Sequence, residues 1–178
     1  MPAQFWQSVL GGPIGGSGTV ANTATLSDCS TQPWPTLPAN FLGYVGASMR
    51  LTAFGQFSTT GTPTLLIGFY YGGVGITPLC ATAATLTGSG VTGVPWRAEA
   101  TFTIVTTGTS GTAKAQGVCW LGTSSTVWTP LPMFTATLGT VTPIDTTSAK
   151  YLSLGVQWSS ANASNTITCQ QFIAESLV

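Results

Sequence analysis

The chain has 178 residues, of which four are Lys or Arg, four are Asp or Glu and none is His, so its formal net charge is zero. The charged fraction of 4% is far below the quarter that is usual for a soluble domain. Without histidine the chain cannot form a Ser-His-Asp or Cys-His catalytic arrangement, and its neutrality argues against a nucleic-acid-binding surface. We therefore expect a protein that is not an enzyme, holds no cofactor or metal, and acts as a subunit packed among neighbours.

The N-terminal residues combine a short apolar segment with a glycine-rich one. Phe5–Leu10 contains two aromatic residues, and glycines are frequent in residues 11–18. We expect residues 1–17 to form an extended arm, which either covers an edge of its own domain or docks on a neighbouring subunit. Met1–Leu10 lacks the basic and continuous apolar parts of a signal peptide, so we expect a chain that is made and used in a cytosol or released by lysis.

Strand patterns dominate the rest of the chain. Apolar and polar residues alternate in Ala47–Ser58, Trp96–Thr107 and Tyr151–Trp158, which predicts strands with one buried face. Thr64–Tyr71 is continuously apolar, as is typical of a central strand covered on both faces, and the stretch that continues to Ile76 is too short to span a bilayer. Further strands are expected at Gly18–Ser27, Pro78–Leu86, Thr112–Leu121, Met133–Val141 and Thr166–Val178, the last with Ile167, Cys169, Ile173 and Leu177 on one face.

Turn chemistry separates these strands. Residues 58–63 and 107–112 are short and contain glycine, as hairpin connections require, and the proline-rich residues 31–38 cannot form a central strand. The longer connections at residues 28–46 and 122–150 favour crossings between two sheets. We predict an all-β fold with one domain at residues 18–178, an antiparallel β-sandwich of jelly-roll-like topology preceded by the extended N-terminal arm.

Three interpretations of the four cysteines remain open: a zinc site, buried free thiols and a disulfide. Cys29, Cys80, Cys119 and Cys169 contain no CxxC pair, and a zinc site would need all four thiols from distant segments. Buried free thiols that act as small apolar side chains are the default interpretation. A disulfide between Cys29 and Cys80 is the second.

The charged residues offer little catalytic chemistry. Arg97 and Glu99 are two positions apart on one predicted strand face, which indicates a surface ion pair. Asp145 precedes a predicted strand and is expected to cap a turn through its side chain. Asn162-Ala-Ser164 matches a glycosylation sequon, but such triplets arise often by chance.

Aromatic residues are the more informative set. The chain contains six Trp, four Tyr and eight Phe, and aromatic side chains are enriched both at protein interfaces and in sugar-binding clefts. Both a protein interface and a carbohydrate-binding module therefore remain open. The candidate contact residues are Phe5, Trp6, Leu10, Trp34 and Trp128.

Several strings resemble a group of small virion proteins of tailed bacteriophages. Leu37–Leu42 followed by Met49–Gly55 resembles the entry into the first long strand of those proteins, and Phe57–Leu65 resembles their hairpin. Pro95–Glu99, the turn at residues 107–111 and Ser164–Cys169 extend the likeness, which covers residues 18–178.

The resemblance implies an all-β virion component of jelly-roll type that assembles as a trimer. We expect a capsid decoration protein or minor capsid protein that binds the major capsid protein or another virion protein and reinforces the head shell. A tail or fibre-tip protein is the alternative within virions. The expected location is the virion, after assembly in the host cytoplasm, with no nucleic acid or membrane as a partner.

Overall fold

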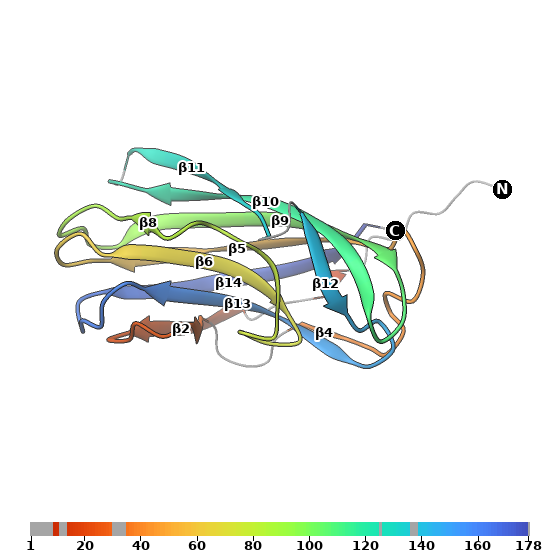
Figure 1. Cartoon of the computed structure of the whole chain (residues 1–178). Coiled ribbons are helices and arrows are strands. Elements are labelled where there is room, and N and C mark those ends of the chain that lie inside the picture. Colours follow the sequence, from red (N-terminus) through yellow and green to blue (C-terminus); the bar gives the residue numbers. More distant parts are fainter. Residues whose placement is uncertain (1–8, 11–13, 30–34, 125, 136–138, 178) are drawn as a thin grey trace.

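The computed structural model describes residues 9–10, 14–29, 35–124, 126–135 and 139–177. Two antiparallel sheets pack face to face in this part of the chain, and the layers are visible in Figure 1. The predicted all-β sandwich is confirmed.

The larger sheet has eight described strands. Their order is β1-β14-β5-β9-β10-β11, with β2 also paired to β14 and β12 also paired to β10. The strands span Val9–Leu10 (β1), Ile14–Ala21 (β2), Ser48–Ser58 (β5), Val94–Thr106 (β9), Gly111–Gly122 (β10), Trp128–Met133 (β11), Thr140–Ile144 (β12) and Thr166–Ser176 (β14).

The smaller sheet has six described strands in the order β3-β13-β6-β7, with β4 also paired to β13 and β8 to β6. The strands span Ser27–Asp28 (β3), Thr36–Leu37 (β4), Thr64–Tyr71 (β6), Thr77–Ala81 (β7), Thr85–Leu86 (β8) and Lys150–Trp158 (β13).

The chain crosses repeatedly between the two sheets. It does so from β2 to β3, β4 to β5, β5 to β6, β8 to β9, β12 to β13 and β13 to β14. Residues 28–46 and 122–150 contain two of these crossings, and β4, β11 and β12 form within them. The expected crossings between two sheets are confirmed, and the jelly-roll-like topology stays a prediction.

The core lies between the inner faces of the sheets. Inward residues alternate with outward ones along β5 and β9, so that Met49, Leu51, Trp96 and Phe102 are at most 1% exposed. Phe69 of β6 stacks on Phe172 of β14 with ring centroids 5.8 Å apart, which joins the two sheets directly. Each such side chain contributes about 1.5–3 kcal/mol through its burial.

Four sequence predictions about strands are wrong in detail. Pro78–Leu86 is not one strand, because β7 ends at Ala81 and β8 begins at Thr85. Gly18–Ser27 is not one strand, because β2 ends at Ala21 and β3 begins at Ser27. Met133–Val141 holds the end of β11 and the start of β12. Along β14 the predicted face fails at Gln170, where the pairing to β5 shifts by one residue and the pairing to β2 is also irregular. Phe172 and Ala174 are therefore buried, while Ile173 lies on the outer side.

Part of the predicted arm pairs with the chain's own sheet. Val9–Leu10 and Ile14–Ala21 both lie against β14, as expected for a segment that covers an edge of its own domain. Residues 1–8 and 11–13 lie outside the described residues.

The cysteines are free and buried, as the default interpretation predicted, and Cys29 and Cys80 are not bonded. Cys29 directly follows β3, and Cys80 lies in β7 at the other edge of the same sheet. Because β13 and β6 lie between these strands, the separation is three strand spacings, about 14 Å. A disulfide requires Cα atoms within about 7 Å of each other.

Candidate functional site

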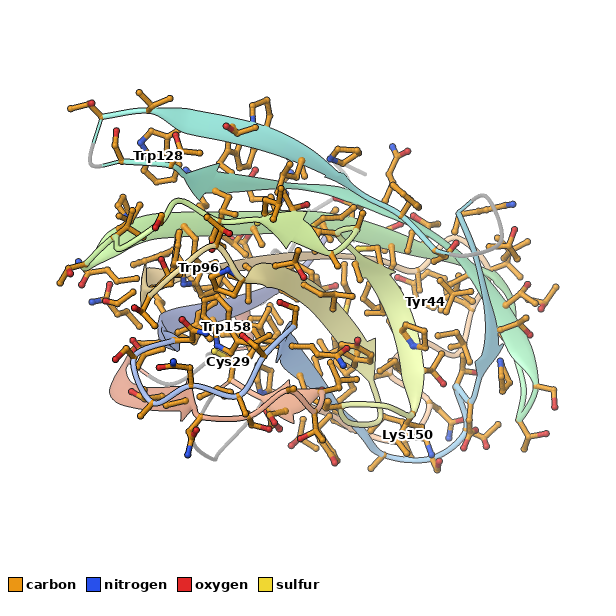
Figure 2. All side chains as sticks on the ribbon, turned by 60° about the vertical axis from the view of Figure 1, so that its left-hand side comes forward. Cys29, Tyr44, Trp96, Trp128, Lys150 and Trp158 are labelled. Atoms are coloured by element: carbon orange, nitrogen blue, oxygen red, sulfur yellow. The ribbon has the colours of Figure 1, made fainter. Side chains whose placement is uncertain are left out.

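Two surfaces of the molecule carry unusual groups of exposed side chains. One is the outward face of the larger sheet, which we call the outer face. The other is the end of the sandwich at which β5 and β13 begin and β9 and β14 finish. Trp128 belongs to the outer face and Tyr44 to that end, and Figure 2 shows them on opposite sides of the molecule.

Most of the charged residues of the protein lie on the outer face. Strict alternation along its strands turns Arg50, Arg97, Glu99, Lys114 and Glu175 outward, five of the eight charged residues in the sequence. The remaining polar groups on this face include Thr, Gln and Ser side chains.

Cross-strand register arranges these residues in rows. Gln171, Phe54, Arg97 and Trp120 form one row across β14, β5, β9 and β10. Two rows further along this face Glu175 lies opposite Arg50, and their side chains form an ion pair at 3.8 Å. Facing residues in adjacent strands have Cβ atoms about 5 Å apart, so the rows bring distant segments together.

Arg97 is held on two sides. Its guanidinium donates to the Glu99 carboxylate, which confirms the predicted pair, and it lies over the Trp120 ring, 5.9 Å from the centroid. A cation at that distance is attracted to the face of the indole. The ion pair and the ring together fix the position of the guanidinium.

The outer face contains hollows. One cavity of about 470 Å³ is lined by residues that include Phe54, Gln56, Arg97, Trp128 and Gln170, and we call it the Trp128 cavity. A second of about 470 Å³ lies around Arg50, Glu99 and Phe134. A third, of about 300 Å³, borders Lys114 and Thr103.

The second surface is apolar. Eleven large apolar side chains are exposed in the described part of the chain, and six of them lie at the end defined above. We call this group the apolar end: Tyr44, Val45, Ile76, Val105, Tyr151 and Leu177.

Backbone hydrogen bonds hold the loops of the apolar end together. The Gly46 amide donates to the Ile104 carbonyl at 2.9 Å, which places the 44–45 turn beside the end of β9. The Leu177 amide donates to Ser48 at 3.0 Å, and the Thr146 amide donates to Gly108 at 3.0 Å. These bonds join segments far apart in sequence at this end of the sandwich.

A hollow of about 380 Å³ opens at this end and has both apolar and charged walls. Ile76, Tyr71, Asp145 and Lys150 are among its lining residues. Lys150 and Asp145 form an ion pair at 3.3 Å, and the Tyr71 hydroxyl donates to the Asp145 carbonyl at 2.7 Å. Burial, with the Asp145 charge as a smaller cause, raises the pKa of Tyr71 to about 12, so its hydroxyl stays a donor at neutral pH.

Asp145 caps its turn as predicted. Its carboxylate accepts hydrogen bonds from the Ser148 hydroxyl and from the Thr147 hydroxyl and amide. These donors, the Ser148 hydroxyl first, hold the pKa of Asp145 well below its ordinary value. The carboxylate is therefore fixed in its charged form beside Lys150.

The predicted contact residues have mixed outcomes. Trp128 lies on the edge strand β11 with its side chain exposed and forms a wall of the Trp128 cavity. Leu10 lies in β1 opposite Ala174. Phe5, Trp6 and Trp34 lie outside the described residues.

Sequence reasoning missed several of the site residues. Phe54 interrupts the polar side of an alternating strand, and this exception was the visible sign that it faces outward. No pattern in the sequence marks Gln170, because its side chain faces the cavity only as a result of the β-bulge. The gathering of Val45 and Ile76 depends on long-range contacts between loops.

Among the described residues no cluster of three or more Cys, Asp or Glu side chains could hold a metal ion. The same residues include no helix long and apolar enough to cross a membrane. Comparisons with protein families, curated proteins and solved structures found no match to this chain.

Proposed function

We propose that the protein is a non-enzymatic structural component of a tailed-phage virion, a capsid decoration or minor capsid protein that binds the outside of the head shell as a homotrimer. Its partner is the major capsid protein. The apolar end is the docking surface. The observation that supports this proposal most is the concentration of exposed apolar side chains at one end of a chain that has almost no charge.

The anatomy of the apolar end suits a protein partner. Protein interfaces combine a centre of large apolar side chains with a rim of polar groups. Here Tyr44, Val45 and Ile76 supply the apolar centre, and the hollow beside Ile76 can take a side chain of the partner. The Asp145–Lys150 pair provides polar groups at the rim. An apolar group of this kind on a weakly charged protein favours association over a free monomer.

The first test is a cryo-EM reconstruction of the phage particle with this chain traced in the map. The proposal expects trimeric density on the icosahedral shell, with the apolar end toward the major capsid protein. Density confined to the tail or to the portal vertex would instead assign a tail component. Absence of the chain from the particle would overturn the virion assignment.

The second test uses purified protein and shells stripped of it. The double variant Val45→Asp/Ile76→Asp buries two carboxylates in the proposed interface, so we expect it to lose at least about 2 kcal/mol, roughly a thirtyfold loss of shell affinity. Leu86→Asp is the matched control, because Leu86 is 66% exposed at the opposite end while Val45 is 66% and Ile76 69% exposed. Equal shell binding by all three proteins would contradict the proposed docking surface.

A further inference from the structure

The Trp128 cavity is separate from the apolar end and has a different chemistry. Its volume of about 470 Å³ falls within the range of small-molecule sites, about 300–1,000 Å³. β5, β9, β11 and β14 all contribute to its walls. Most of its floor is regular sheet, so the side chains that line it stand on rigid backbone.

Two exposed aromatic rings from different strands border the cavity. Trp128 is 43% exposed on the edge strand β11, and Phe54 is 37% exposed on β5. An exposed ring costs solvation free energy unless something covers it, and a flat apolar surface of this kind matches the C–H face of a sugar ring.

Uncharged hydrogen-bonding groups also line the cavity. Gln56 and Gln170 each carry an amide that can both donate and accept, and Thr52 adds a hydroxyl. Such groups can pair with hydroxyls in either direction. They suit a ligand whose polar groups are themselves both donors and acceptors.

A β-bulge aims one of these amides. Gln170 is the extra residue on β14 that has no partner in the register with either β5 or β2, and its side chain is exposed on the cavity side. Bulges are frequent beside binding sites, where they redirect a side chain. Without the bulge, β14 would place a single glutamine on this part of the face instead of two.

The charged group in the cavity lining is already paired, which favours a neutral ligand. Arg97 is the charged residue of the lining, and it is already paired with Glu99 and stacked over Trp120. An anionic ligand would have to compete with the Glu99 carboxylate. A peptide would find few free backbone groups here, because the backbone of the floor is engaged in the sheet.

From these observations we propose that the Trp128 cavity binds a short neutral oligosaccharide, stacked on Trp128 and Phe54 and hydrogen-bonded by Gln56, Gln170 and Arg97. This proposal goes beyond the proposed virion function and does not depend on it. A glycan site on one face and a docking surface at one end can act in the same particle.

The test is a glycan array with the full chain, followed by NMR titration with cellotriose, mannotriose and triacetylchitotriose. We expect at least one neutral glycan to bind and to shift the indole N–H resonance of Trp128. Trp128→Ala should weaken binding about tenfold or more, and Phe54→Ala and Gln170→Ala by several fold. Tyr151→Ala is the matched control, since Tyr151 is an aromatic residue of similar exposure, 40%, at the other end.

Three results would overturn the proposal. The first is no perturbation of Trp128 by any neutral glycan at millimolar concentration. The second is equal binding by the wild type and by a Trp128→Ala variant whose thermal unfolding is unchanged. The third is that proline-rich peptides or anionic glycans, and not neutral ones, titrate the Trp128 resonance.

Discussion

At the scale of single residues, Ser153 is one of two described residues, with Trp158, whose buried side-chain polar atom has no hydrogen-bond partner. Its side chain lies on the outward side of β13, yet it is fully buried, and its hydroxyl has no hydrogen-bond partner among the described residues. The buried Tyr70 ring covers the neighbouring Gly155, where an added Cβ would lie 2.5 Å from a ring carbon. Tyr70 therefore removes water from this part of the smaller sheet.

Ser153→Ala should stabilise the protein by about 1 kcal/mol, because it removes a buried hydroxyl that loses hydration without gaining a partner. Urea unfolding followed by tryptophan fluorescence measures the change. Ser48→Ala is the control, since the Ser48 hydroxyl bonds the Thr103 hydroxyl at 2.7 Å and the Gly46 carbonyl at 3.0 Å, and its loss should destabilise. A destabilised Ser153→Ala variant would show that the hydroxyl has a partner in solution.

At the scale of elements, the bulge in β14 decides which residues of the last strand enter the core. Cys169 faces Gly55 and Gln171 faces Phe54, so Gln170 is inserted between two consecutive pairs of the ladder. Plain alternation from Ile167 would bury Ile173 and Leu177. The bulge instead buries Phe172, which stacks on Phe69.

Deleting Gln170 should leave the fold intact, because the pairs on both sides of it then follow one another in a regular ladder with the central neighbour β5. We expect a melting temperature within a few degrees of the wild type, together with weaker glycan binding through loss of one amide. Deleting Thr168 is the control. It would force either Ile167 or Gln170 onto the wrong face, so the deletion should unfold the protein or lower its melting temperature strongly. Similar losses of melting temperature from both deletions would contradict the assignment of Gln170 as an extra residue outside the ladder.

The edge strand β11 contains two prolines, which limit further strand pairing. Pro130 and Pro132 lie opposite Trp120 and Val118, and proline is tolerated at sheet edges where its missing N–H would face solvent. An edge with two prolines offers few donors to an additional strand. Association through this edge by strand addition is therefore disfavoured, which leaves the face and the end as binding surfaces.

At the scale of the whole molecule, the sequence contains no histidine, so no side chain has an ordinary pKa between 5 and 8. Burial raises the pKa of Cys80, Cys119 and Cys169 from 9.0 to about 12. An unfolded chain releases these protons near pH 9, whereas the folded chain keeps them. The stabilisation is thus complete below pH 9 and is lost as the pH rises toward 12.

The free energy of unfolding should therefore change little between pH 5 and 8 and fall above pH 9. At pH 10 each of these thiols lowers it by about 1.4 kcal/mol, and urea unfolding in the presence of a reductant measures the slope. The variant Cys80→Ala/Cys119→Ala/Cys169→Ala should show a much smaller slope. An unchanged slope would mean that other groups, such as Tyr71, dominate the alkaline response.

Long alternating segments made the sandwich predictable from the sequence. β5, β6, β9, β10, β13 and β14 all lie within one to three residues of the predicted bounds, because each buries one face over many positions. The short β11 and β12 were mislocated, since Pro130 and Pro132 obscure the strand pattern of β11. Of the site, Trp128 and the Arg97–Glu99 pair were predicted, and the cavity that Trp128 borders was not.

By itself, the sequence determined the class of fold and the scarcity of acid–base chemistry, because these follow from the two-residue period of strands and from composition. The tertiary structure decided which exposed residues meet. Val45 and Ile76 share an end only because loops from both sheets close there, and Gln170 joins Trp128 only because β14 bulges and pairs beside β5. Such contacts depend on strand order and register, which are set by the packing of the whole sandwich and leave no local pattern in the chain.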